Sequence, residues 1–313
     1  MRSFLRILFV LILVGAFSTI FFLPLSSHDI EAEEAKKIVT TIFPAYDFAR
    51  TISKDTNTEV KLLIKPGTDL HSYEPTPQDI ISIKEADIFI YNGGESEAWV
   101  NDILKEVDQE NTVILRMMDA VELKTEDASG EDSTEYDEHI WTSPLNVIKI
   151  SEAIAQAIKN HSPDDSSVVQ RNLDEYKSQL ETLDQDFRAL ANQKTGTLVV
   201  ADRFPFKYFV DEYHFDYLAA FPGCSEQTEA STKTIAELTK SVKSSTKKIV
   251  FKLELSNSKV AKTIADSTKA KILTWHSVHN ISQSDFEAEK TYLDFMHENL
   301  NVLGEALDDR AAD

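Results

Sequence analysis

The chain has 313 residues, 42% of them hydrophobic, and a formal net charge of −21 at pH 7. The length allows one large or two moderate hydrophobic cores, and the hydrophobic fraction is that of a globular protein rather than a disordered one. The charge argues against nucleic acid as a partner and against adsorption to anionic lipid, because both interactions need a basic surface. A single cysteine, Cys224, excludes an intramolecular disulfide and a thiolate-rich zinc site.

Residues 1–27 are predicted to be a signal peptide or an N-terminal membrane anchor. Arg2 and Arg6 precede an apolar run over 7–25, which is long for a cleaved signal and just long enough to span a bilayer. The positive flank predicts a cytoplasmic N-terminus and an exported remainder at the bacterial cell surface. Cleavage and retention both stay open, with an anchor slightly favoured. Because no cysteine lies near this segment, we expect that the protein is not a lipoprotein.

Residues 28–145 are predicted to form an N-terminal lobe in which strands and helices alternate. Such an alternation predicts a parallel sheet flanked by helices, with ligand-carrying loops at the carboxyl ends of the strands. Within this lobe, residues 122–138 are rich in Asp, Glu, Ser and Thr and are expected to be a solvated surface loop. The expected elements are strands over 38–42, 60–64, 88–91 and 113–115 and helices over 45–53, 77–83 and 97–106.

A helical connection is predicted over 146–195, followed by a C-terminal lobe over 196–313. Apolar residues recur at helical spacing in 145–161 and in 166–193. The second helix would be about 42 Å long at about 1.5 Å per residue, which exceeds an ordinary globular helix. A coiled coil is the alternative, but the segment has too few heptads. In the C-terminal lobe we expect strands over 196–200, 249–251 and 272–273 and a closing helix over 292–307.

Histidines in three loop-like segments indicate a metal site. His71 lies between Pro66-Gly67 and Pro75-Thr76-Pro77, and His139 has comparable surroundings ahead of Pro144. His276 and His279 follow the apolar run at 272–273. Imidazole is the commonest metal-binding side chain, and ligands gathered from distant loops are how a folded cavity captures a metal. One such histidine alone is more often an ordinary polar loop residue, but three together favour a metal site.

The chain resembles the metal-binding solute receptors of bacterial ABC importers that carry zinc or manganese. The resemblance implies an α/β fold of two βα lobes, each with a parallel sheet flanked by helices, joined by one long backbone helix. It also implies capture of a divalent cation between the lobes, ABC permease and ATPase subunits as partners, a monomeric receptor and no enzymatic activity. The segments that carry the match are 39–44, 71–77, 86–93, 137–141 (similar to the family's Asp-Pro-His-x-Trp), 292–293 and 299–303.

The resemblance assigns the family's first two metal ligands to His71 and His139. The third ligand position falls on Arg203, whose guanidinium has no lone pair to give and therefore cannot ligate. The neighbouring Asp202 could supply an oxygen instead, or Asp202 and Arg203 could form a structural ion pair. His276 lies near the position of the family's fourth ligand, usually a carboxylate.

The expected site is therefore His71, His139, His276 and Asp202, with His279 or water as alternatives to Asp202. Three imidazole nitrogens favour Zn²⁺, while Mn²⁺ is possible but prefers more oxygen ligands. Two other functions compete with that of a receptor. A metal-dependent hydrolase would need an open coordination position and a general base, and the sequence has no His-Glu-x-x-His pattern. A surface adhesin that keeps the fold without transport is supported only by Arg203.

The three-histidine site predicts a steep loss of metal affinity in acid. Each coordinating imidazole must be neutral, and a free histidine titrates near a pKa of about 6.5. We expect affinity to fall between about pH 7 and about pH 5 more steeply than a single protonation allows. Titration calorimetry across this range tests the expectation, and a flat affinity would contradict a site built from three histidines.

Overall fold

The computed structural model describes residues 34–68, 73–125, 136–221, 223 and 230–310. The predictions for the leader, for His71, for Cys224 and for most of the acidic loop fall outside these residues. The chain divides into Met1–Glu34 and a compact unit, Ala35–Asp313, and the description below concerns the second unit. In the part of the chain that is described, no helix combines the length and apolar character needed to cross a membrane.

The N-terminal sheet has four parallel strands in the order β2-β1-β3-β4. The β3 strand is buried throughout, as expected for a parallel sheet covered on both faces. One face packs on α3 and α4 through a cluster that includes Val39, Phe89 and Val100. The elements are β1 (Lys36–Thr40), α2 (Phe43–Ile52), β2 (Thr58–Leu62), α3 (Pro77–Lys84), β3 (Ile88–Tyr91), η2 (Glu95–Glu97), α4 (Val100–Ile103), β4 (Val113–Arg116) and η3 (Met117–Ala120).

The single helix expected over 97–106 is instead two short helical pieces, η2 and α4. Gly93 and Gly94 precede them with φ values of 97° and 92°, a left-handed conformation that glycine adopts without steric cost. Glu97 then turns inward, and its carboxylate accepts the N–H of Gly93 at 2.7 Å. The apolar spacing predicted helical structure here, but the structure has a single 3₁₀ turn and a four-residue α-helix in place of one helix over 97–106.

The C-terminal sheet repeats the arrangement with four parallel strands in the order β7-β6-β8-β9. Helices α8 and α9 cover one face through a cluster that includes Val199, Leu238, Val250 and Ile264. The sequence patterns predicted β6, β8 and β9 but not β7 or the helices between the strands. The elements are β6 (Thr197–Val200), α7 (Lys207–Tyr213), β7 (Asp216–Ala219), α8 (Thr232–Ser244), β8 (Ile249–Lys252), α9 (Lys259–Thr268), β9 (Lys271–Thr274) and α10 (Gln283–Glu287).

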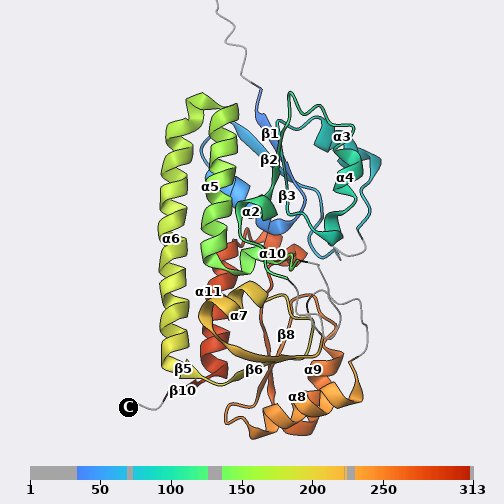
Figure 1. The fold of residues 1–313 in the computed structure, drawn as a ribbon, viewed down its shortest axis with the longest axis vertical. Helices are drawn as coiled ribbons and strands as arrows, with labels where there is room; N and C mark the ends of the chain where they lie inside the picture. The colour runs from blue at the N-terminus through green and yellow to red at the C-terminus, as the bar shows by residue number, and fades with distance from the viewer. Residues whose placement is uncertain (1–33, 69–72, 126–135, 222, 224–229, 311–313) are drawn as a thin grey trace, which may run out of the picture. The chain divides into compact units, whose positions relative to one another are not determined.

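Long helices run alongside both sheets (Figure 1). The longest, α6, covers the 28 residues Ser166–Gln193, the range expected from its apolar spacing. One hydrophobic cluster contains residues of β1, α6 and β6, so the two lobes share a continuous core. The α/β fold with two parallel-sheet lobes and a long helix is confirmed. The remaining elements are η4 (Ile140–Thr142), α5 (Pro144–His161), η5 (Pro163–Asp165), α11 (Tyr292–Ala306) and the antiparallel pair β5 (Lys194–Thr195) and β10 (Asp308–Asp309).

A buried ion pair on α2 holds the start of α11. Asp47 is fully buried; one of its oxygens accepts the N–H of Tyr292 at 2.8 Å, and the other lies 2.8 Å from the Arg50 guanidinium. Arg50 also donates to the carbonyls of Glu289 and Lys290. Burial raises the pKa of the Asp47 carboxyl, and Arg50 opposes that rise. The contact joins the first helix of the N-terminal lobe to the last long helix of the chain.

We expect Asp47→Ala to lower the free energy of unfolding by about 2–4 kcal/mol, because it leaves a buried N–H and a partly buried guanidinium without their acceptor. Thermal or urea unfolding measures the loss. Asp102→Ala is the control, since Asp102 forms an exposed ion pair with Lys105 and such pairs contribute little. An equal effect of the two substitutions would show that the Asp47 contact is not important for stability.

Candidate metal site

His139 lies in the segment between β4 and α5, and its ring is buried. The residue is 2% exposed and precedes η4. Asp137 accepts the His139 backbone N–H at 2.8 Å through Oδ1, and the same oxygen lies 3.1 Å from Nδ1 of the ring. A carboxylate on one ring nitrogen fixes the orientation and tautomer of an imidazole and makes the other nitrogen a better metal ligand. In this arrangement Nε2 is the ring nitrogen of His139 that would serve as a metal ligand.

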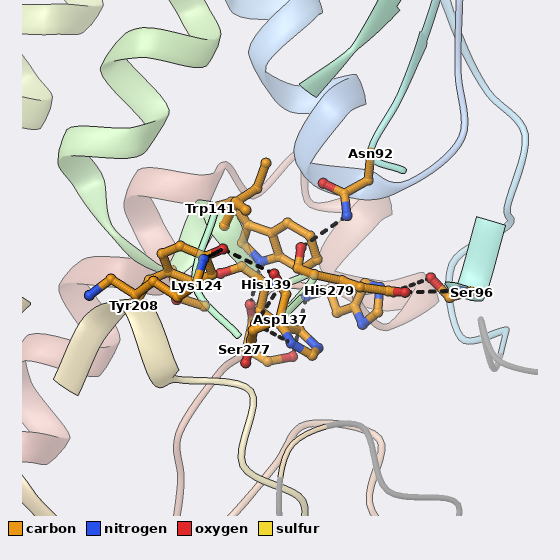
Figure 2. A network of polar contacts seen from close by, with 12 residues as sticks. Asn92, Ser96, Lys124, Asp137, His139, Trp141, Tyr208, Ser277 and His279 are labelled. Carbon is orange, nitrogen blue, oxygen red and sulfur yellow. Dashed lines mark hydrogen bonds and ion pairs between the residues drawn. The ribbon is translucent and has the colours of Figure 1, made fainter. Parts of the chain in front are cut away.

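His279 lies beside His139, on the loop that follows β9. The centroids of the two rings are 5.2 Å apart, and the His279 ring is 4.9 Å from that of Trp141. Figure 2 shows these side chains gathered where the loops of the two sheets meet. The Trp141 indole N–H donates to the Ser277 carbonyl at 2.8 Å, which ties the two loops together. The loops therefore bring two imidazoles from opposite lobes into contact.

His276 has a different environment from that of His279. Its ring packs 4.9 Å from the ring of Phe295 on α11, and its Nε2 lies 3.5 Å from a carboxylate oxygen of Glu298. The Asn299 side chain forms two hydrogen bonds of 2.8 Å with the backbone of His276. Burial lowers the pKa of His276, and the carboxylates of Glu254 and Glu298 oppose that shift. The ring contacts therefore associate His276 with α11, whereas the ring beside His139 is that of His279.

Both carboxylate oxygens of Asp202 accept hydrogen bonds from backbone N–H groups. Oδ1 accepts the N–H of Arg203 at 3.0 Å, and Oδ2 accepts the N–H of Leu253 at 3.3 Å. These bonds tie the loop after β6 to the end of β8. Among the described residues, no three His, Cys, Asp or Glu side chains lie close enough together to form a metal site. The four-residue ligand set predicted from the sequence, which includes His71, stays a prediction.

Tyr208 and Ser277 support the site and were not singled out from the sequence. The Tyr208 hydroxyl donates to the Asp137 carbonyl at 3.1 Å and accepts the N–H of Lys124 at 3.0 Å. Ser277 donates to both oxygens of Glu254 through its N–H at 2.8 Å and its hydroxyl at 2.6 Å. Neither residue type has a metal-binding signature, so only their nearness to Asp137 and Trp141 identifies them.

The residues present suit a divalent cation of intermediate softness. Two partly or fully buried imidazoles meet edge to face, and Asp137 orients one of them. Nitrogen ligands with a carboxylate behind them are typical of zinc sites.

Comparison with known proteins first defines the class. The chain has two parallel-sheet lobes along a long helix, and loops of both lobes contribute imidazoles. The family model described as zinc-uptake complex component A, periplasmic (ZnuA), matches residues 38–306. The chain therefore belongs to the ZnuA family of transporter receptors.

Individual relatives agree with this assignment. The high-affinity zinc uptake system protein ZnuA of Bacillus subtilis is 30% identical over 281 residues, covering 86% of this chain and 87% of the relative. The zinc-binding lipoprotein AdcA of Streptococcus pneumoniae is 27% identical over 296 residues, which is 92% of this chain but 59% of AdcA.

Solved structures show the same fold. The Bacillus subtilis lipoprotein YcdH matches with a TM-score of 0.75 and 29% identity, covering 87% of this chain and 100% of YcdH. The Zn(II)-bound ZnuA-like domain of Streptococcus pneumoniae AdcA matches with a TM-score of 0.72 and 27% identity, covering 88% of this chain and 99% of that domain.

The prediction that this protein is not a lipoprotein is wrong in the light of these relatives. AdcA is named a zinc-binding lipoprotein and YcdH a metal-dependent lipoprotein. The prediction relied on the absence of a cysteine near the first residue. The names of these relatives therefore overturn a prediction that was based on the first residues alone.

A buried carboxyl near the site makes stability depend on pH. Burial raises the pKa of Glu97 from 4.5 to about 7, against hydrogen bonds that lower it, and nearby Glu138 adds to the rise. The folded protein therefore binds this proton more tightly than the unfolded chain does. Stability from this group is complete below about pH 4.5 and is lost as the pH rises through about 7.

We expect Glu97→Gln to remove this loss, because a neutral amide replaces the protonated acid. Relative to the variant, the wild-type protein should lose up to about 3 kcal/mol of unfolding free energy between about pH 5 and about pH 8. Urea unfolding at several pH values measures the difference. Glu95→Gln, on an exposed residue of the same helical turn, should leave the pH dependence unchanged. A parallel pH dependence of wild type and Glu97→Gln would contradict the assignment.

Proposed function

We propose that this protein is the extracytoplasmic substrate-binding component of a metal ABC transporter. It captures a divalent cation between its two lobes, zinc in preference to manganese, and delivers it to a membrane permease. The observation that carries the proposal is the contact between the rings of His139 and His279, which come from loops of opposite lobes and have centroids 5.2 Å apart. The zinc-binding names of the relatives and the Zn(II)-bound AdcA domain support the choice of metal.

The ligand set that we favour contains His71, His139 and His279. His279 takes the part first expected of His276, because its ring lies beside His139 and the His276 ring packs on Phe295. Asp202 is the weaker candidate for a fourth donor, since its two oxygens already accept backbone N–H groups. A water molecule or the protein's own Asp202, after a shift of the loop, would complete four-coordinate zinc.

Receptors of this family work with an ABC permease and an ATPase, and we propose the same partners here. We also propose that the chain acts as a monomer, with residues 1–27 as its leader and lobes bounded near 145 and 196. A laminin-binding protein of Streptococcus agalactiae, described as both adhesin and metal transporter, shares the fold at 25% identity. No contact in the described residues of this chain favours adhesion over metal capture.

Competition between metals tests the function directly. The purified full chain, stripped of metal, is mixed with equimolar Zn²⁺ and Mn²⁺, and the retained ions are measured by elemental analysis. We expect about one zinc ion per chain, because nitrogen-rich sites favour zinc over manganese. Retention of neither metal would exclude the receptor function, and hydrolytic activity of the zinc-loaded protein would favour the hydrolase alternative.

Two matched substitutions test the choice between the neighbouring histidines. We expect His279→Ala to weaken zinc binding by at least about 100-fold, because it removes a direct ligand. His276→Ala should change affinity by less than about 10-fold, the lower limit for residues that support a ligand without binding the metal. Chelator-competition titration measures both. The reverse order of effects would restore His276 as the ligand.

A further inference from the structure

Glu138, the residue before His139, is buried, and its carboxylate accepts hydrogen bonds from a second loop. Glu138 is 5% exposed. Its Oε1 accepts the backbone N–H of Ser96 at 2.9 Å, and its Oε2 accepts the Ser96 hydroxyl in a short hydrogen bond. The two dashed lines at Ser96 mark these bonds in Figure 2. One serine therefore engages both oxygens of the carboxylate.

The turn that contains Ser96 is shaped to receive Glu138. A Cβ atom added to Gly94 would lie 2.3 Å from Oε1 of Glu138, so only glycine fits there. The side-chain amide of Asn92 donates to the Glu138 backbone carbonyl at 2.9 Å. Glu97 closes the same turn by accepting the Gly93 N–H. The loop carrying His139 is consequently held to the end of β3 through the side chain and the backbone of Glu138.

We propose that Ser96 and Glu138 are positioning residues for metal capture, an inference that rests on the proposed function. Their contact fixes the backbone on which His139 stands, while Asp137 fixes the ring itself. Without the contact, the loop carrying His139 has to be ordered when the metal binds, and that ordering costs conformational entropy. Ser96 and Glu138 thus set the affinity for zinc as supports of His139.

Proline provides an independent way to stiffen the same position. In the described part of the chain the Glu138 N–H donates no hydrogen bond that a proline would remove, and its φ is not in the positive range. A proline fixes φ at about −65° and lowers the entropy of the free loop. If the contact acts by restraining the backbone, Glu138→Pro should bind zinc without needing the contribution of Ser96.

The test is a set of zinc affinities measured on the full chain by chelator competition, with melting temperatures of the metal-free proteins alongside. We expect Ser96→Ala and Glu138→Ala each to weaken zinc binding by about 10-fold, and the double variant to be no weaker than Glu138→Ala, because both remove one contact. Ser96→Thr keeps the hydroxyl and the N–H and should retain wild-type affinity. Ser82→Ala, on α3, is the control and should bind as the wild type does.

The proline background separates positioning from a purely structural or electrostatic role. Glu138→Pro should bind zinc within about 3-fold of wild type, and adding Ser96→Ala to it should have no further effect. Equal affinities for wild type and Ser96→Ala, with only the melting temperature lowered, would overturn the inference and leave the receptor function intact. Additive losses in the Ser96→Ala and Glu138→Ala pair would also overturn it. A wild-type chain that binds no zinc would overturn the proposed function as well.

Discussion

The contacts of Trp141 are the constraint on which the arrangement of the candidate site depends. Its indole is fully buried and donates to the Ser277 carbonyl, while its own carbonyl accepts the Tyr292 hydroxyl at 2.9 Å. Its ring lies against those of both His139 and His279. A large aromatic ring with one polar atom can fill a core and fix a loop at the same time. Through this residue the loops of the two lobes keep a defined separation.

Carboxylates concentrated at the edge of the N-terminal sheet give the site its electrostatic character. Asp137, Glu138 and Glu97 are all buried, and each accepts at least one backbone N–H. Burying several carboxylates is costly, which is why one of them, Glu97, holds its proton more tightly than usual. Asp137 and Glu138, which precede His139 in the chain, provide negative charge where a cation is expected. Rigid support and favourable charge thus come from the same residues.

The types of most elements followed from local sequence patterns. The apolar spacing over 166–193 predicted α6 at its observed limits, and the β-branched and apolar runs predicted strands where β1, β2, β3 and β4 lie. Helix and strand periodicities are local, so they can be read without knowledge of packing. The same patterns did not reveal β7, whose residues are exposed or half-buried, or the break between η2 and α4.

The sequence by itself predicted parallel-sheet lobes that carry histidines on loops, and several segments together, above all 71–77 and 137–141, gave the resemblance to metal receptors. It placed His276 in the expected ligand set and left His279 as an alternative to Asp202, although residues three apart in a loop have no fixed orientation relative to a distant ring. Only the tertiary structure shows their different surroundings, since Phe295 and Asn299 of α11 contact His276 while Trp141 and Ser277 contact His279. The pairing of Ser96 with Glu138 was equally hidden, because 42 residues separate the two and only the folded sheet brings their loops together.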